Sequence, residues 1–314
     1  MSGKIAVITG PTATGKTALG VILAQTLNGE VVSADSMQLY RHMDIGTAKP
    51  TVSEMQGVPH HMLDVAEPWE NYSAGRYVQA ASACVDDILA RGRLPVVVGG
   101  TGLYIDALIA GTVFAAAPSD AQLRTRLNAE YDSLGGDGFR EKLAQVDPLR
   151  AEKLHPGDKK RLVRAMEVYL LTGRTITEHD NATKALPPRY DAAKIALTFR
   201  DRQRLYDRID RRVDEMCARG LTDEVRTLIA AGVPRSCTAM QAIGSKEILR
   251  ALDGELTMDE AVALIKRESR RYAKRQLTWL RRDPDLFWIE WAENTDFDWA
   301  RRLSTAFLTR CGIK

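Results

Sequence analysis

The stretch ITGPTATGKTALG, residues 8–20, decides the fold. It follows the apolar run IAVI at residues 5–8, and residues 10–17 match the pattern G-x-x-x-x-G-K-[ST]. In this pattern glycines let backbone N–H groups converge on phosphate oxygens, the lysine adds a positive charge and the final hydroxyl ligates Mg²⁺. Apolar residues continue beyond Thr17 at helical spacing. We therefore predict a strand, a phosphate-binding loop and a helix whose N-terminus faces the anion.

The composition is that of a globular protein. The chain has 314 residues, 45% of them hydrophobic and 27% charged, enough for one large domain or two ordinary ones. Its four cysteines show no C-x-x-C spacing, which argues against a zinc site or a disulfide framework and suits a reducing compartment. No basic and apolar signal precedes Ile5, and no apolar stretch approaches the roughly 18 residues that span a bilayer. We expect a cytoplasmic protein.

Short β-rich runs alternate with helical patterns. Four runs, at residues 4–10, 29–35, 93–100 and 194–200, are typical of buried parallel strands, and residues 286–291 could add an edge strand. From Pro118 onward the pattern is helical, with Ser119 or Asp120 as a cap and Gly173 ending a strongly apolar helix. We predict an α/β protein with a core at residues 1–117 and 184–314, an all-helical insertion at 118–183 and a helical C-terminal region.

The phosphate-binding loop lacks its usual acidic partner. Nucleotide hydrolases with this loop carry an apolar strand that ends in an acid, but here the corresponding run ends in Gly99 and Gly100. An acid, Asp35, instead ends the second run, where it could bind a substrate, ligate a metal, take a proton, or simply cap the next helix. Thr101, after the double glycine, could offer a functional hydroxyl or cap a helix.

Eight segments, in order and over nearly the whole chain, resemble the bacterial tRNA dimethylallyltransferases, also called tRNA isopentenyltransferases. They are GPTATGKT (10–17), SADSMQLYRHMDIGTAKP (33–50), GVPHHMLDV (57–65), YSAGRYV (72–78), VVVGGTGLY (96–104), KKRLVRAMEVYLLTG (159–173), RIDRRVDEM (208–216) and AKRQLTWLR (273–281). The resemblance implies a P-loop NTPase-like core with the helical insertion over the tRNA anticodon stem-loop. It also implies transfer of a dimethylallyl group from its diphosphate to N6 of adenosine 37, giving N6-dimethylallyladenosine and diphosphate. The partners would be tRNA and dimethylallyl diphosphate, with Mg²⁺ as cofactor; we expect a monomer that binds no membrane.

The resemblance also implies roles for individual residues. Asp35 would accept the proton from N6, with Thr101 hydrogen-bonding nearby. The expected ligands of the diphosphate are Gly10, Pro11, Thr12, Ala13, Thr14, Gly15, Lys16 and Thr17, of which Thr17 also holds Mg²⁺, followed by Arg212 and then Arg208. The expected tRNA contacts are Asp35, Ser36, Met37, Gln38, Thr101, Lys159, Lys160, Arg161, Leu162, Val163, Met240, Gln241, Ala242, Ile243, Gly244 and Ser245.

Two positions depart from the family pattern. Ser245 stands where the family commonly has tyrosine, so no aromatic stacking is carried over to it. Thr14 replaces a serine and retains its hydroxyl.

Basic residues concentrate in one C-terminal stretch, because Lys266–Arg282 holds eight basic residues and one acid, Glu268. We assign its basic side to RNA phosphates and interpret its aromatic side, including Tyr272 and Trp279, as packing on the core. The adjacent His60 and His61 are interpreted as structural because no third ligand stands at a suitable spacing.

Three other functions compete with this prediction. A small-molecule P-loop kinase would share the loop and the sheet but would not need the basic insertion. An enzyme that prenylates a free adenine nucleotide would lack much of the insertion. A non-catalytic RNA-binding protein would leave Lys16 and Asp35 unexplained.

Overall fold

The computed structural model describes residues 3–112, 114 and 120–313, and it divides the chain into two compact units. The first is Met1–Ile109 with Arg189–Lys314, and the second is Ala110–Pro188. The predicted insertion, 118–183, falls within the second unit. None of the described helices is long and apolar enough to cross a membrane.

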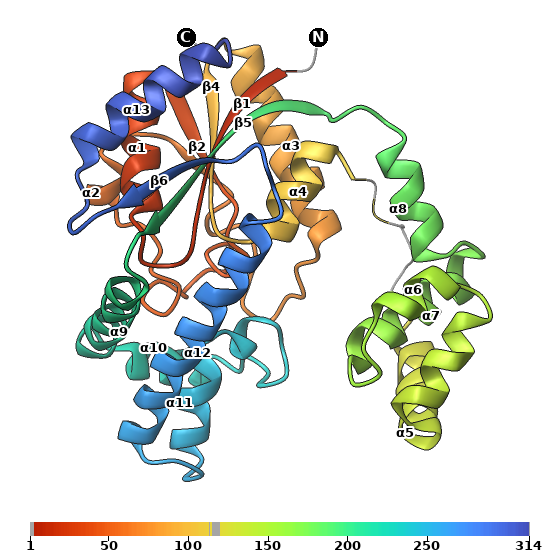
Figure 1. Ribbon diagram of the computed structural model, residues 1–314. Coiled ribbons are helices and arrows are strands. Elements are labelled where there is room, and N and C mark those ends of the chain that lie inside the picture. The colour runs from red at the N-terminus through yellow and green to blue at the C-terminus, as the bar shows by residue number, and fades with distance from the viewer. Residues whose placement is uncertain (1–2, 113, 115–119, 314) are drawn as a thin grey trace. The chain divides into compact units, whose positions relative to one another are not determined.

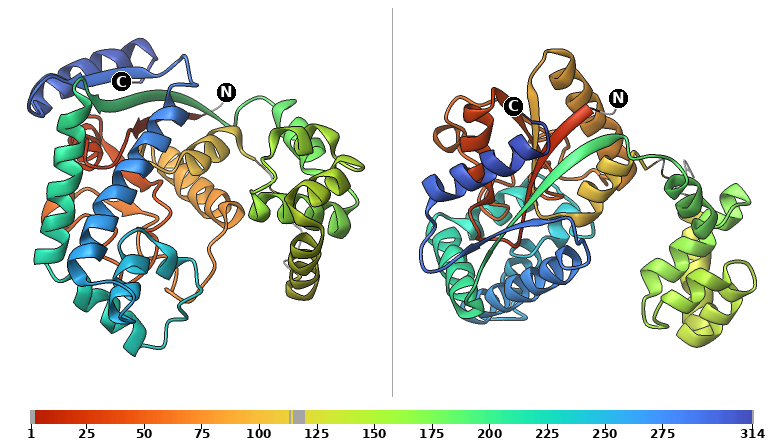
Figure 2. Two further views of the ribbon diagram at one scale, coloured as in Figure 1. Left: turned by 60° about the horizontal axis from the view of Figure 1, so that its bottom comes forward. Right: turned by 45° about the horizontal axis from the view of Figure 1, so that its top comes forward.

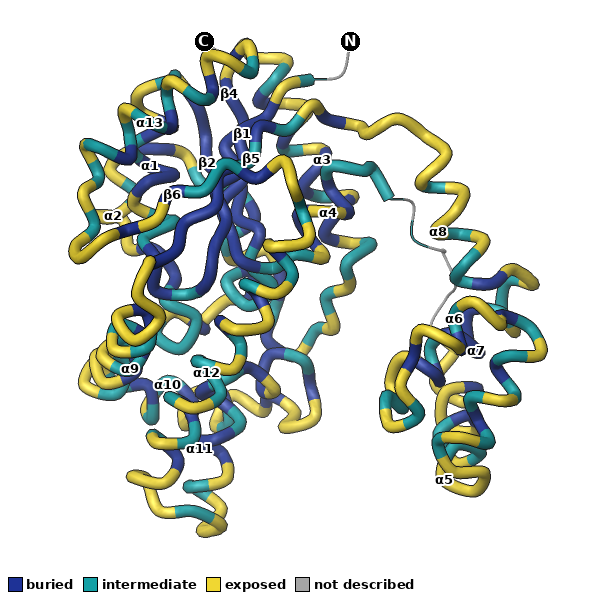
Figure 3. Tube along the Cα trace, in the orientation of Figure 1, coloured by how far each residue is buried: buried dark blue, intermediate teal, exposed yellow. Residues whose placement is uncertain are grey.

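A six-stranded parallel sheet forms the centre of the first unit (Figure 1), in the order β3-β2-β4-β1-β5-β6. The strands are β1 (Gly3–Thr9), β2 (Gly29–Ser33), β3 (His60–His61), β4 (Leu94–Val98), β5 (Tyr190–Phe199) and β6 (Phe287–Trp291). Residues 5–8 of β1 are fully buried, and Figure 3 shows the inner strands as buried over most of their residues. The predicted parallel α/β sheet and its edge strand β6 are confirmed.

Helices cover both faces of this sheet (Figures 1 and 2), with α1 and α13 on one face and α3 and α4 on the other. The bounds are α1 (Lys16–Thr26), α2 (Val52–Met55), α3 (Ala74–Ala90), α4 (Gly102–Ala110) and α13 (Phe297–Arg310). The apolar sides of α1 and α13 join the strands in one hydrophobic core. Most residues of the sheet are therefore shielded from water, and ligands can approach at the carboxyl ends of the strands.

The remaining helices of the first unit gather near the carboxyl ends of the strands (Figure 1). They are α9 (Arg202–Ala218), α10 (Leu221–Ala230), α11 (Ser245–Leu252) and α12 (Met258–Leu280). Because α9 follows β5 after two residues, its start is fixed at this edge. Ligands of open parallel sheets bind at that edge, so these helices are placed to complete a site.

The second unit is a helical bundle with its own hydrophobic core. It contains α5 (Ala121–Ala144), α6 (Pro148–Lys153), α7 (Lys159–Thr172) and α8 (Ile176–Lys184). Asp120 caps α5, and Gly173 ends α7 with a positive φ of 69°. The other predicted cap, Ser119, lies outside the described residues. Glu167 on α7 is fully buried and is neutralised by Arg124 and Arg164.

Away from the strand ends, a buried carboxylate ties β2 to its neighbours. Glu30 is 2% exposed and accepts hydrogen bonds from Arg91, Arg93 and His61. Bonding to Arg91 is the main reason why the pKa of Glu30 falls to about 2, and burial opposes that change. The group therefore stabilises the folded state most at pH values above 4.5, the ordinary value for the carboxyl.

This carboxylate predicts acid sensitivity. As pH falls from 4.5 towards 2, the folded protein should lose on the order of 2–3 kcal/mol of unfolding free energy from Glu30 alone. Urea unfolding gives the free energy of unfolding of the wild type and of Glu30→Gln at pH 7 and pH 3. The wild type should lose more unfolding free energy between the two pH values than the variant, and the difference is the contribution of Glu30. Equal losses for the two proteins would contradict the assignment.

Candidate active site

The loop after β1 has the shape that its sequence predicts. Gly10, Ala13 and Gly15 have positive φ angles of 142°, 66° and 87°. At Gly10 an added Cβ would lie 2.4 Å from the carbonyl oxygen of Leu197, so a glycine is required there. Thr14 is buried and donates its hydroxyl to the carbonyl of Pro11 at 2.8 Å, which ties the loop to itself. Backbone N–H groups at the start of α1 are consequently presented to the space in front of the loop.

Three cations meet at this loop. Lys16 donates to the carbonyl of Pro11 at 2.7 Å, and Arg208 on α9 donates to the carbonyl of Ala13 at 3.1 Å. Burial, and then the charge of Arg212, lower the pKa of Lys16 to about 7, although Asp35 opposes the change. Burial also lowers the pKa of Arg212. Such crowding of half-buried cations is unfavourable by itself and is relieved by an anion, so the group is suited to a highly charged ligand.

Asp35 lies just beyond the end of β2. Its Oδ1 accepts the backbone N–H of Met37 at 2.9 Å and of Gln38 at 3.4 Å, so it does cap the turn that follows. The carboxylate also lines the same cavity as Lys16. Capping and a role in chemistry are thus compatible here, since only Oδ1 is engaged by the turn.

The double glycine after β4 brings two segments close together. An added Cβ on Gly99 would lie 2.2 Å from the carbonyl oxygen of Ala34, and one on Gly100 would lie 2.2 Å from Nε2 of Gln276. The buried side chain of Gln276 donates to the carbonyl of Gly100 at 2.9 Å and accepts the N–H of Thr12 at 3.1 Å. Gln276 on α12 therefore joins the end of β4 to the phosphate-binding loop.

Thr101 connects this turn to Asp35. Its hydroxyl accepts the backbone N–H of Ser36 at 3.1 Å, and its own N–H donates to the carbonyl of Ala34 at 3.1 Å. Thr101 also begins α4, since its carbonyl accepts the N–H of Tyr104 at 2.9 Å. The hydroxyl is thus directed at the residue next to Asp35.

A cavity of about 820 Å³ in the first unit collects most of the predicted residues. Basic residues outnumber acidic ones along its walls, and the acids include Asp35. Predicted site residues lining it are Thr12, Ala13, Thr14, Gly15, Lys16, Thr17, Asp35, Ser36, Met37, Gln38, Arg208, Arg212, Gln241, Ala242, Ile243 and Gly244. Further cations on its walls are Arg211, Arg219, Lys246 and Arg275.

Among the residues of α12 that line this cavity, the sequence does not predict Ile265, Ser269, Tyr272 and Gln276 as part of the site, and the last two have polar groups near the loops. Tyr272 lines it, so its interpretation as a core-packing residue is wrong. Burial, and then Asp35, raise the pKa of Tyr272 to about 12, so the phenol keeps its proton near the carboxylate. Gln276 is the second, and its only sequence signal is its position within AKRQLTWLR. Trp279 does pack on the core as expected, and its indole donates to Asp106 at 2.9 Å.

Other predicted residues lie elsewhere. Gly10 and Pro11 are buried within the loop itself, and Met240 and Ser245 are buried beside the cavity-lining segment 241–244. Leu162 and Val163 belong to the hydrophobic core of the second unit. Because the side chains of Met240, Ser245, Leu162 and Val163 are buried, any contact of these four residues with RNA would use their backbone atoms.

Basic side chains at the start of α7 in the second unit are accessible. Lys159 forms an ion pair with Asp132 at 2.6 Å, and Arg161 lies 3.4 Å from a carboxylate oxygen of Asp158. Lys160 is exposed, and among the described residues no carboxylate lies within ion-pair distance of it. Lys160 is therefore the best placed of the three to meet a phosphate.

The residues around the loop fit a magnesium ion that arrives with phosphate oxygens. Thr17 lines the cavity directly after Lys16, and the Asp35 carboxylate lies in the same cavity. Within the described ranges, no group of three or more His, Cys, Asp or Glu side chains could hold a metal alone. Mg²⁺ keeps much of its coordination to water and substrate phosphates, so one hydroxyl and a carboxylate suffice on the protein side. Of the two adjacent histidines, His61 pairs with Glu30 at 2.7 Å, and His60 reaches the cavity wall.

Comparisons with known proteins agree on one family. A family model described as IPP transferase matches residues 38–283, and one described as isopentenyl transferase matches residues 3–71. A tRNA dimethylallyltransferase from Acetivibrio thermocellus is 46% identical over 286 residues, 91% of each chain. The crystal structure of a tRNA isopentenylpyrophosphate transferase from Bacillus halodurans has a TM-score of 0.73 and 41% identity, covering 98% of each chain. A eukaryotic dimethylallyltransferase acting on tRNA has a TM-score of 0.84 and 30% identity, covering 100% of this chain and 81% of that one.

Proposed function

Because the chain belongs to the IPP transferase family, we propose that it transfers a dimethylallyl group from dimethylallyl diphosphate to N6 of adenosine 37 in tRNA, with release of diphosphate. One observation carries the proposal: a single cavity holds a cationic cluster, Lys16 with Arg208 and Arg212, and a carboxylate, Asp35. The first suits a leaving diphosphate and the second suits a nitrogen that loses a proton.

The cationic cluster acts on the leaving group. As the bond between the allylic carbon and oxygen breaks, negative charge grows on the diphosphate, and preorganised positive groups stabilise that charge. Lys16 and the backbone N–H groups of the loop hold the phosphate oxygens, with Arg212 and Arg208 closing the site from α9. Because an anion favours the charged form of Lys16, bound diphosphate should raise the lowered pKa of this lysine.

Mg²⁺ would be held by the hydroxyl of Thr17 together with phosphate oxygens, and it would supply further neutralisation of the diphosphate charge. Asp35, one of the acids that line the cavity, would be available to support the ion. We propose that magnesium supports activity when it is bound at Thr17 and near Asp35.

Asp35 acts on the acceptor. The exocyclic N6 of adenine is a weak nucleophile, since its lone pair is delocalised into the ring. When N6 bonds to the allylic carbon, one of its protons must leave, and the carboxylate of Asp35 accepts it. Thr101, through Ser36, fixes the turn that carries Asp35. Tyr272, whose pKa is raised to about 12 by burial and then by Asp35, supplies a phenolic O–H on the wall of the same cavity.

The RNA contacts follow from charge and position. We propose that the segments 35–38 and 240–245 surround the target nucleotide, which must leave its stack to enter a closed site. The amide of Gln38 bonds to the carbonyls of Thr47 and Ala48 at 3.3 and 3.2 Å, so base recognition by Gln38 would use its remaining acceptor capacity or exchange these bonds. The residues at the start of α7 and the basic side of α12 would bind phosphates of the stem.

A transfer assay tests the proposal. With labelled dimethylallyl diphosphate, Mg²⁺ and an unmodified anticodon stem-loop, we expect label in the RNA, located by nucleoside mass at adenosine 37. Label on free adenosine monophosphate instead would favour the nucleotide-prenylating alternative. Transfer of the γ-phosphate from ATP, without prenyl transfer, would favour a kinase and contradict the proposal.

Removing one basic side chain of α7 should weaken RNA binding without changing chemistry. For Lys160→Ala we expect weaker binding and a plot of log affinity against log salt that is shallower by about one. Filter binding from low to high salt measures this slope. Lys142→Ala, which removes a lysine paired with Glu130, serves as control. An unchanged slope for Lys160→Ala would count against phosphate contact.

A further inference from the structure

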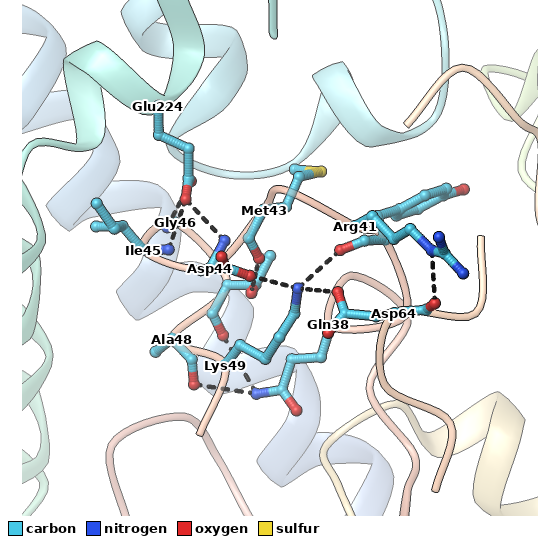
Figure 4. A network of polar contacts seen from close by, with 12 residues as sticks. Gln38, Arg41, Met43, Asp44, Ile45, Gly46, Ala48, Lys49, Asp64 and Glu224 are labelled. Atoms are coloured by element: carbon cyan, nitrogen blue, oxygen red, sulfur yellow. Dashed lines mark hydrogen bonds and ion pairs between the residues drawn. The ribbon is translucent and has the colours of Figure 1, made fainter. Parts of the chain in front are cut away.

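One carboxylate, remote in sequence, holds the backbone of the motif DIGTAKP, residues 44–50. Glu224 on α10 accepts the N–H groups of Asp44, Ile45 and Gly46 at 2.7, 2.7 and 2.9 Å (Figure 4). Successive backbone N–H groups that point the same way form a concave anion site. Here that site is filled by a side chain of the protein. Both carboxylate oxygens are used, so the contact fixes orientation as well as distance.

The side chain of Lys49, which belongs to the same loop, forms hydrogen bonds that stabilise the loop. Its ammonium is buried and donates to the carbonyl of Tyr40 at 2.9 Å and to the carboxylates of Asp44 and Asp64 at 2.5 and 2.6 Å (Figure 4). Asp64 belongs to the chain after β3, where its carbonyl also accepts from Arg41 at 3.0 Å. The loop is thus internally braced by Lys49, while Glu224 is its connection to the C-terminal helices.

The braced loop forms a wall of the active-site cavity. Gly46, Thr47, Ala48 and Pro50 all line it. The Gln38 amide rests on the carbonyls of Thr47 and Ala48, and the Gln38 N–H bonds to Asp35. If residues 46–48 moved, the side chain of Gln38 would move with them, and the hydrogen bond from the Gln38 N–H would shift the Asp35 carboxylate in turn.

Glu224 also lies close in the chain to the residues proposed to bind the diphosphate. Helix α10 begins at Leu221, three residues after the end of α9, which carries Arg208 and Arg212. At Gly46 an added Cβ would lie 3.0 Å from Leu221 and 3.2 Å from the Glu224 carboxylate, so loop and helix pack closely. The helix hairpin that presents the guanidinium groups is therefore joined to the loop next to Asp35.

We propose that Glu224 is a positioning residue for prenyl transfer: it sets the acceptor wall, residues 35–50, at the correct distance from the diphosphate ligands of α9. This inference rests on the proposed function. The inference predicts that loss of the carboxylate weakens binding of the acceptor nucleotide more than binding of the diphosphate. The reason is that Glu224 bonds to residues 44–46, whereas the phosphate-binding loop, residues 10–17, is a separate segment.

The experiment compares Glu224→Ala with Asp223→Ala, a matched control on the same helix whose carboxylate pairs only with Arg226 among the described residues. We expect kcat/KM for the RNA to fall about 30-fold in Glu224→Ala, with KM for dimethylallyl diphosphate within about twofold of wild type. Glu224→Gln, which keeps one acceptor oxygen, should lie between. Hydrogen exchange at the amides of residues 44–46 should accelerate in both Glu224 variants and not in the control.

A purely structural role gives a different result. It would lower the fraction of protein that binds diphosphate, measured by calorimetric titration, and leave both KM values unchanged; that pattern, or kinetics equal to those of Asp223→Ala, overturns the inference. If the wild type fails to prenylate RNA, the proposed function fails. In that case unchanged exchange at residues 44–46 in Glu224→Ala would overturn the positioning contact separately.

Discussion

Replacing Lys16 with methionine is expected to reduce kcat/KM for prenyl transfer by about 10³-fold, because it removes a preorganised charge from the leaving diphosphate. Methionine keeps most of the length and the apolar stem, so the loop should retain its shape through Thr14, which bonds to Pro11 independently. Lys4→Met, at the opposite end of β1, is the control and should transfer at nearly the wild-type rate. A decrease of less than about tenfold for Lys16→Met would refute the central role of this charge.

The pKa of Lys16 adds a second, independent signature. Since its value in the free protein is about 7 and the diphosphate binds the charged form, binding takes up a proton at higher pH. Affinity for the diphosphate should therefore fall by up to about tenfold per unit as pH rises above 7. Calorimetry in buffers of different ionisation enthalpy measures the proton uptake. In Lys16→Met the diphosphate still titrates but the lysine is absent, so the affinity of this variant for diphosphate should vary less between pH 7 and higher pH.

For Asp35→Asn, transfer is expected to fall by about 10³-fold while the RNA remains bound. The substitution separates the two roles that the sequence leaves open. Asparagine retains an Oδ1 that can accept the N–H groups of Met37 and Gln38, so the cap survives, but its amide has negligible basicity towards N6. Single-turnover rates and RNA affinity, measured together, distinguish loss of chemistry from loss of binding.

Asp35→Ala completes this comparison. It removes the cap as well as the base, so it should be as slow as Asp35→Asn and also less stable, by about 1 kcal/mol. Asp207→Ala, on the exposed side of α9, is a control with the same loss of charge. Were Asp35→Asn near wild type and Asp35→Ala slow, capping would be the whole role of this residue.

Much of the fold follows from the sequence because buried strands and the phosphate-binding loop have local signatures. The runs before Gly10, at β2 and at β4 are apolar and end in turn residues, and each forms a strand. The strand β3 has only two residues, His60 and His61, too few for any periodicity. The first half of β5 and most of α8 lack an apolar pattern. Their structure comes from pairing of β5 with β1 and from capping of α8 by Thr175.

For the site, sequence identifies residues that follow strands and misses those supplied by distant helices. Lys16 and Asp35 are marked by the strands before them, and the structure brings both to one cavity. Tyr272, Gln276 and Glu224 carry no local signal, since an amphipathic helix can present an aromatic, amide or acidic side chain to core, solvent or ligand alike. Only the packing of α10 and α12 against the loops decides which surface each one meets.

The register of the central strands has a consequence for biosynthesis. Gly3 of β1 pairs with Tyr190 of β5, and the whole helical bundle of the second unit lies between them in the chain. On the ribosome, β1 can pair with β4 before the bundle is made, but its other neighbour, β5, emerges only after it. The bundle can close through short-range contacts as soon as α8 is made. We therefore expect the helical bundle of the second unit to fold before β5 and β6 complete the sheet.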